Sequence, residues 1–203
     1  MKILIVSGSF SPPRHVPRGI RTSELVKEFS KRGDEVKLYI PEFDYDFTSF
    51  IKQYKNVSVN SLDVRLTSLR RPNFFLLNYL FALIRGGLNF FFAYPDIKLY
   101  FAIPKVLKQE SGYDLLISLA NPHSVHWGVA RLFKKNPAVA TTWVADCGDP
   151  YMLISKLNYK GIRLNTMFYF KGLEKSFCRR ANYIAVPAEA SKGGYYPEFQ
   201  DKI

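Results

Sequence analysis

Short apolar runs alternate along the chain with longer stretches in which apolar residues recur at the period of a helix. A short apolar run of roughly four to eight residues is typical of a buried strand. The runs interpreted as strands are Lys2–Val6, Glu35–Ile40, Leu115–Leu119, Val139–Val144 and Tyr183–Val186, with one or two weaker strands at Val57–Asn60 and Val64–Leu66. The expected helices are Ile20–Lys31, Asp96–Lys108, His123–Lys134, Ile162–Arg180 and Ala188–Tyr195. This alternation predicts an α/β fold with a parallel sheet and right-handed connections.

Polar residues follow two successive strands of this predicted sheet. Asn121, His123 and His126 come after the strand Leu115–Leu119. Asp146 and Asp149 come after the next strand. Functional groups in open parallel sheets gather at the carboxyl ends of strands, so these side chains form a candidate site at one edge.

A long, proline-rich loop follows the first strand, with the sequence SGSFSPPRHVPRG. It contains no GxGxxG fingerprint and no P-loop lysine, so it does not indicate a dinucleotide site. One interpretation is a solvated connection. The other is a substrate loop that offers Arg14, His15, Arg18 and the nearby Arg21 to an anionic ligand, since guanidinium groups form strong charge-assisted hydrogen bonds.

The composition indicates a folded, basic protein. The chain has 203 residues, of which 47% are hydrophobic, and a net charge of +12. That charge favours a negatively charged partner. Nucleic acid is not expected, because the basic residues are scattered and no RNA- or DNA-binding motif is found. The two cysteines form no motif, which favours a reducing, cytoplasmic setting. The apolar run Ile3–Val6 is too short for a signal peptide, which needs roughly seven apolar residues.

The segment Phe74–Tyr94 is strongly apolar and has three interpretations. A transmembrane helix is disfavoured, because Arg85 near its centre costs about 3 kcal/mol and cancels much of the apolar gain. The favoured interpretation is a pair of core helices that are separated at Gly86-Gly87. The third is a peripheral membrane patch, with aromatic residues in the interface and arginines on anionic headgroups, namely Arg65, Arg70, Arg71 and Arg85.

Two motifs carry a resemblance to a known family. The sequence NPHSVHW, a helix ending in two lysines and then WVADCGDPY is similar to the N-terminal domain of family 4 glycosyltransferases, which have the GT-B fold. The opening also resembles that family, with a proline-rich loop and then a helix ending in RGDEV. In the opening of this chain, Arg18-Gly19 stands where the family often carries two glycines. The resemblance covers essentially the whole chain and implies a single Rossmann-like domain over residues 1–203, with helices on both faces of the sheet. This would be the N-terminal half of a GT-B fold.

The resemblance implies that this domain is the acceptor-binding half of a hexosyltransferase-like enzyme, retaining and independent of metal. A second domain, absent from these 203 residues, would bind the nucleotide-sugar donor and carry a pair of glutamates. The expected acceptor is a cell-surface glycan or a lipid-linked sugar. No other cofactor is expected. The location would be cytoplasmic, with contact to the inner face of an anionic membrane. The alternative function is a sugar- or anionic-lipid-binding module without catalysis.

The resemblance also suggests roles for the residues at the sheet edge. Asp146 stands where relatives place a polar active-site residue, and Asp149 is the second catalytic candidate. The residues expected to bind the acceptor are Arg14, His15, Arg18, Gly19, Asn121, His123 and His126. A structural interpretation stays open for several of them: Asp149-Pro150 as a turn, His123 as a helix start and His126 as a packed helix residue. The histidines lack the spacing of a zinc site.

Overall fold

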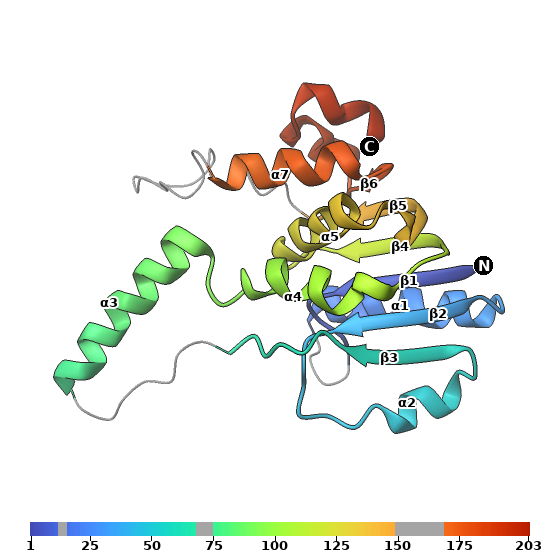
Figure 1. Ribbon diagram of the computed structural model, residues 1–203, viewed down its shortest axis with the longest axis horizontal. Coiled ribbons are helices and arrows are strands. Elements are labelled where there is room, and N and C mark those ends of the chain that lie inside the picture. The colour runs from blue at the N-terminus through green and yellow to red at the C-terminus, as the bar shows by residue number, and fades with distance from the viewer. Residues whose placement is uncertain (12–15, 68–74, 149–168) are drawn as a thin grey trace.

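A six-stranded parallel sheet forms the centre of the molecule (Figure 1). The computed structural model describes residues 1–11, 16–67, 75–148 and 169–203, and the six strands lie within them. The strands are β1 (Lys2–Ser7), β2 (Glu35–Ile40), β3 (Val57–Ser61), β4 (Tyr113–Leu119), β5 (Ala140–Asp146) and β6 (Tyr183–Ala185). They lie in the order β3-β2-β1-β4-β5-β6, and each neighbouring pair is parallel. The predicted α/β, Rossmann-like sheet is therefore confirmed.

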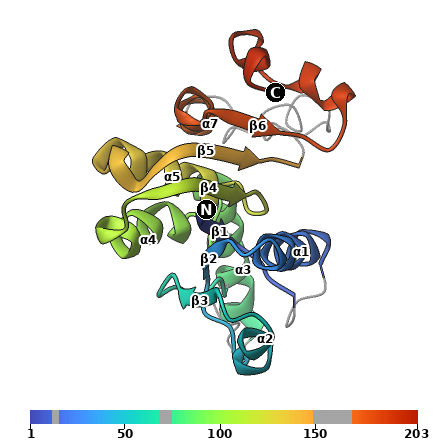
Figure 2. The same ribbon diagram turned by 90° about the vertical axis from the view of Figure 1, so that its right-hand side faces the viewer.

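Helices cover both faces of this sheet. The α-helices are α1 (Pro17–Lys31), α2 (Thr48–Gln53), α3 (Phe75–Phe92), α4 (Lys98–Val106), α5 (Ser124–Lys135) and α7 (Tyr169–Arg180). Short 3-10 helices are η1 (Leu107–Gln109), η2 (Pro137–Val139), η4 (Glu189–Gly194) and η5 (Pro197–Lys202). The view along the strands places α1 on one face and α4 and α5 on the other (Figure 2). The expected arrangement with helices on both faces is thus observed.

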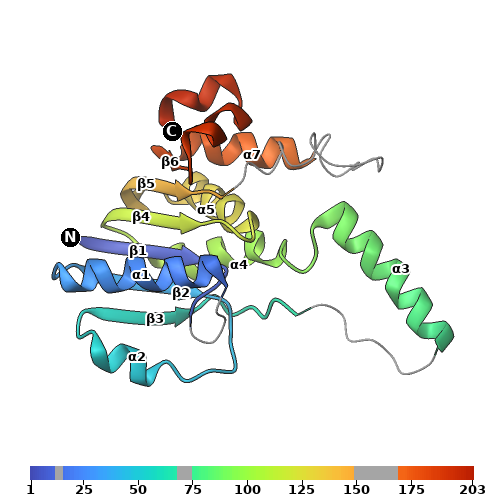
Figure 3. The same cartoon turned by 180° about the vertical axis from the view of Figure 1, so that it is seen from behind.

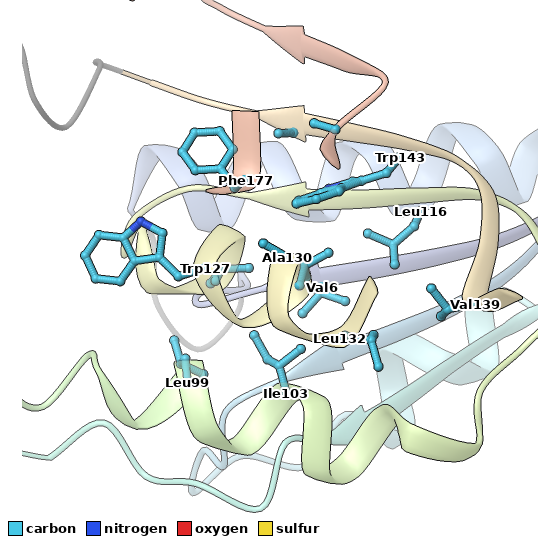
Figure 4. Close-up of a cluster of buried hydrophobic side chains, with 14 of the residues drawn as sticks. Val6, Leu99, Ile103, Leu116, Trp127, Ala130, Leu132, Val139, Trp143 and Phe177 are labelled. Atoms are coloured by element: carbon cyan, nitrogen blue, oxygen red, sulfur yellow. The ribbon is translucent and has the colours of Figure 1, made fainter. Parts of the chain in front are cut away.

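The strands divide their side chains between two hydrophobic clusters, because alternate residues of a strand point to opposite faces. Leu4 of β1 belongs to the cluster under α4, α5 and α7, whereas Ile3 and Ile5 belong to the cluster on the α1 side. The first cluster is the larger and includes Trp127 and Trp143, both almost fully buried (Figure 4). These apolar layers hold the strand ends in fixed positions.

Helix α1 begins three residues earlier than predicted. Pro17 is at its start, where the missing N–H of proline costs nothing and its fixed φ suits a helix. The correction moves Arg18 and Gly19 from the expected loop into the first turn of the helix. At the other end, Gly33 has a φ of +82°, and the N–H of Asp34 donates to the carbonyl of Phe29, as in a Schellman motif. The predicted helix end at Gly33 is therefore confirmed.

Helix α3 contradicts the interpretation of Phe74–Tyr94 as two core helices. It is one helix that continues through Gly86-Gly87. It stands away from the sheet, on the side where the carboxyl ends of the strands lie (Figures 1 and 3). Leu80 and Leu83 are 51% and 57% exposed. Two glycines cost a helix roughly 2 kcal/mol together, which lowers its stability without forcing a break. No helix among the described residues is long and apolar enough to cross a membrane.

Smaller differences concern short elements. Val64–Leu66 is not a strand, and the one-and-a-half-turn helix α2 was not expected. The predicted last helix is the 3-10 helix η4 instead, and β5 extends to Asp146, two residues beyond its expected end. Residues 162–168 of another expected helix lie outside the described part of the chain, and α7 is its remainder.

Candidate functional site

The carboxyl ends of β1 and β4 mark the point where the strand order of the sheet reverses, which is the usual ligand position in open α/β sheets. The loops that follow these two strands touch. Gly8, just after β1, lies so close to Pro122 that a side chain at position 8 would collide with the proline ring. Glycine is therefore needed there, and the two loops form one continuous edge that leads to β5.

Asp146 is the last residue of β5 and contacts two arginines of α1. Its carboxylate oxygens accept hydrogen bonds from Arg18 Nη1 at 3.1 Å and from Arg21 Nε at 2.5 Å. The Asp146 side chain is only 5% exposed, whereas those of Arg18 and Arg21 are 20% and 52% exposed. The register of β5 against β4 and β6 holds the carboxylate, and the start of α1 presents both guanidinium groups to it.

A pocket of about 250 Å³ opens beside this ion-pair cluster. Its lining residues are Pro17, Arg18, Arg21, Asp146, Cys147 and Pro187. Arg18 also lies against Gly148, where a side chain would meet the guanidinium group. The pocket thus combines a buried carboxylate, two cations and apolar walls from two prolines at the carboxyl edge of the sheet.

A chain of hydrogen bonds lies beneath the pocket. Trp143 Nε1 donates to Ser118 Oγ at 2.8 Å, and a second hydrogen bond of 2.7 Å joins Ser118 Oγ and His126 Nδ1. The other imidazole nitrogen, Nε2, lies 3.4 Å from Cys147 Sγ. The chain connects the core of the domain to the pocket wall at Cys147.

These buried groups are held in their neutral forms. Burial, followed by the charges of His123 and Arg18, lowers the pKa of His126 well below its usual value. Burial and the charge of Arg18 lower the pKa of His123 to about 4. Burial raises the pKa of the Cys147 thiol to about 12, so Cys147 is not a thiolate near neutral pH.

The structure brings together only some of the residues singled out in the sequence. Arg18 and Asp146 share the pocket, and His123 lies close enough to Arg18 for its charge to act on the imidazole. Asn121 is exposed in the loop after β4, with a φ of +71°, and does not line the pocket. Gly19 is buried in the first turn of α1.

His126 has a different position from the one expected for an acceptor-binding residue. It is fully buried, and its ring packs on Phe177 at a centroid distance of 5.0 Å. Burial and the bonds to Ser118 and Cys147 place it behind the pocket wall, so the interpretation as a packed helix residue fits it better. Arg14, His15 and Asp149 lie outside the described residues.

Sequence reasoning did not single out Ser118, Trp143 or Cys147 as parts of the site. Ser118 offered a signal, because it is the one hydroxyl within the otherwise apolar run Leu115–Leu119. A polar side chain buried in a strand needs a hydrogen-bond partner, and His126 supplies it. Among the described residues, no group of three or more metal-ligating side chains is found.

Comparison with known proteins gives a match in structure alone. No family model matches the chain, and no curated protein matches it. A crystal structure of Arabidopsis thaliana UGT89C1, complexed with UDP-L-rhamnose, is similar with a TM-score of 0.50 and 12% identity. The similarity covers 98% of this chain and 46% of that one. The apo form of the lipopolysaccharide outer core galactosyltransferase WaaB has a TM-score of 0.47 and 14% identity, over 96% of this chain and 41% of that one.

The chain therefore has a GT-B-like fold, in the form of one α/β, Rossmann-like sheet. It spans somewhat less than half the length of each of these two structures. At 12% identity the likeness concerns the fold, so the activity has to be argued from the residues of this chain.

Proposed function

We propose that this chain is the acceptor-binding domain of a glycosyltransferase, with its substrate site in the pocket of Arg18, Arg21 and Asp146. The observation that carries the proposal is the position of this pocket at the carboxyl edge of the sheet, next to the strand reversal between β1 and β4. The glycosyltransferase-like fold supports the reaction class. The resemblance of NPHSVHW and WVADCGDPY to family 4 supports the assignment to an N-terminal domain.

In the proposed reaction a hydroxyl of the acceptor attacks the anomeric carbon of a nucleotide sugar, and the nucleoside diphosphate leaves. Such transfers pass through an oxocarbenium-like transition state and gain from groups placed to stabilise the departing phosphate. We expect the reaction to be retaining and independent of metal. The donor would be bound mainly by a second domain, so the present pocket would meet the reacting groups across a cleft.

Asp146 acts, in this proposal, mainly by positioning Arg18 and Arg21. Both of its carboxylate oxygens already accept hydrogen bonds from guanidinium groups, and its side chain is almost fully buried. A carboxylate in that setting is better suited to fixing two cations than to removing a proton from an acceptor. This replaces the direct catalytic role expected from the sequence. The proposed role of Asp149 as a second catalytic residue is unchanged.

Kinetics of the full gene product with Asp146→Asn test this role. The substitution keeps the shape of the side chain and removes its charge, so the two arginines lose their anchor. We expect kcat/KM to fall by about a hundred-fold or more, as for the loss of a positioned electrostatic group. An Asp146→Asn enzyme with wild-type kcat/KM would contradict the role. The alternative, a sugar- or anionic-lipid-binding module, would show binding and no turnover by the wild-type protein.

We also propose that helix α3 contacts an anionic membrane surface. Its exposed apolar side chains include Leu80, Leu83 and Phe92. Between residues 64 and 108 the sequence has seven lysines and arginines and a single acid, Asp96. An apolar helix in so basic a segment fits anionic lipid better than a second copy of itself, because two copies would bring like charges together.

The position of α3 agrees with this partner. It projects from the side of the sheet on which the strands have their carboxyl ends (Figures 1 and 3). A lipid-linked acceptor held in a membrane at α3 would therefore lie on the same side as the proposed substrate pocket. Binding to anionic vesicles that weakens with added salt is the measurable consequence.

A further inference from the structure

The charges around the pocket do not cancel. Two guanidinium groups face one carboxylate, which leaves a net charge of +1. The charges are also unequally accessible, because Asp146 is 5% exposed and Arg21 is 52% exposed. A ligand entering the pocket therefore meets the positive groups, with the carboxylate behind them.

Both arginines have hydrogen-bond donors to spare. An arginine has five N–H donors in a planar fork. Arg21 uses Nε to contact Asp146, and Arg18 uses Nη1. Within residues 1–11, 16–67, 75–148 and 169–203, neither guanidinium donates another hydrogen bond. The two terminal Nη groups of Arg21 can donate a bidentate pair of hydrogen bonds, end on, to a phosphate or carboxylate.

The start of α1 adds to the positive field at the same place. Val16 caps the helix without a side-chain hydrogen bond, and its first turn contains no acid. The positive end of the helix dipole is thus not offset locally by a carboxylate in that turn. Arg18 and Arg21 lie in the first two turns, so their charges and the helix end act on one space.

We propose that this pocket is a binding site for a phosphate-type anion, with Arg21 and Arg18 as the donors and Asp146 as the residue that positions them. The proposal rests on the function proposed above and names the substrate chemistry at that site. The anion is either a phosphate group of the acceptor or the diphosphate of the nucleotide sugar. In both cases a bidentate contact to Arg21 fixes the orientation of the bound substrate.

Calorimetric titration of the 203-residue protein tests the site directly. The probes are inorganic phosphate, pyrophosphate, glucose 1-phosphate and UDP. We expect at least one probe to bind, and Arg21→Ala to weaken that binding by roughly ten-fold or more, as for a lost charge-assisted hydrogen bond. Arg18→Lys keeps the charge and removes the fork, so it should weaken binding as well.

Arg32→Ala is the matched control. Arg32 is the residue that caps the other end of α1, its side chain is 61% exposed, and it also contacts a buried carboxylate, that of Asp34, at 3.4 Å. The Arg32→Ala substitution should leave the affinity for each anion probe unchanged. Equal weakening by Arg21→Ala and Arg32→Ala would mean a general charge effect and would overturn the proposal. So would the absence of binding by every probe.

The same titration separates the two sources of the anion. Tighter binding of UDP than of glucose 1-phosphate assigns the site to the donor diphosphate, and the reverse order assigns it to an acceptor phosphate. Anion binding that depends on Arg21, in a full gene product that transfers no sugar, would refute the proposed function and keep the site. Sugar transfer without anion binding that depends on Arg21 would refute the anion site and leave the proposed function standing.

Discussion

At the scale of single residues, the proposed site depends on a buried carboxylate that has two cationic partners. A charge that is out of solvent is tolerated only while it is paired, and Asp146 is 5% exposed. Each arginine can hold it alone to some extent, because each contacts a different oxygen. The two contacts should therefore depend on each other in stability as well as in function.

Removal of the arginines tests this dependence. Arg21→Ala should lower the free energy of unfolding by only about 1 kcal/mol or less, because Arg21 is half-exposed and Arg18 still pairs with Asp146. The double variant Arg18→Ala with Arg21→Ala should lose about 3–5 kcal/mol, since an unpaired buried carboxylate then remains. Urea unfolding of the single and double variants measures both values. A double loss equal to the sum of two small single losses would argue against a carboxylate that needs its partners.

The buried histidines predict how stability depends on pH. The folded-state pKa of His126 lies well below that of an unfolded histidine, near 6.5, and that of His123 is about 4. The unfolded state therefore binds more protons below pH 6.5, so stability falls as the pH decreases from about 6.5 toward 4. Each histidine contributes at most about 1.4 kcal/mol per pH unit.

His126→Asn tests this slope. Asparagine keeps a side chain that can hydrogen-bond the Ser118 hydroxyl, and it has no proton to gain in this range. The variant should lose less unfolding free energy between pH 7 and pH 5 than the wild-type protein does, whatever its stability at pH 7. Urea unfolding at pH 7, 6 and 5 gives the slopes. A variant slope as steep as that of the wild-type protein would show that His126 does not titrate between the two states.

At the scale of elements, the sequence predicts the strands better than it predicts what packs on them. Short apolar runs predict β1, β2 and β4 to within two residues, because a strand with both faces covered is rich in apolar residues. For helix α3 the prediction of a core position is wrong, since an apolar composition does not show which partner covers the helix. Which segments pack against an apolar helix is decided by the tertiary structure.

The candidate site shows the same division. The sequence predicts Asp146 as a site residue because it follows a strand at its carboxyl end, and Arg18 because it stands in an expected substrate loop that proves to be the first turn of α1. Their ion pair was not predicted, since the two residues are 128 positions apart in the sequence. The role of Ser118 depends on His126, which reaches it from α5 only in the folded chain. Contacts of this kind follow from topology rather than from local pattern.

Helix α3 gives the prediction that belongs to this scale. In flotation assays the protein should bind vesicles that contain anionic phospholipid, and less so at high salt. Tyr79→Gln and Leu83→Gln remove side chains that are 67% and 57% exposed, so folding should be unaffected. Each should weaken partitioning by about 1 kcal/mol, or roughly five-fold.

Tyr183→Gln is the control for these variants. Tyr183 is 60% exposed but belongs to β6, away from α3. It should leave vesicle binding as it is in the wild-type protein. Binding that is equal for neutral and anionic vesicles, or no binding to either, would refute the membrane surface. If Tyr183→Gln weakened vesicle binding as much as Leu83→Gln does, α3 would not be the part of the protein that contacts the membrane.

At the scale of the whole molecule, the described residues provide a six-stranded sheet and, at its carboxyl edge, the pocket of Arg18, Arg21 and Asp146. The chain spans 46% of the length of the UGT89C1 chain that it resembles. We propose that catalysis needs a second domain that holds the donor, because the reacting groups must be brought together across a cleft that closes. The 203-residue protein alone should therefore give no turnover with a panel of nucleotide sugars and lipid-linked acceptors. Clear turnover by these residues alone would contradict the two-domain account.

The most direct test of the central claim is the rate of sugar transfer by the full gene product from radiolabelled nucleotide sugars. Wild-type protein, Arg21→Ala and Arg32→Ala are compared under the same conditions. We expect transfer by the wild-type protein, a fall in kcat/KM of roughly ten-fold or more for Arg21→Ala and no change for Arg32→Ala. Transfer that is indifferent to Arg21, or no transfer from any nucleotide sugar, would contradict this claim.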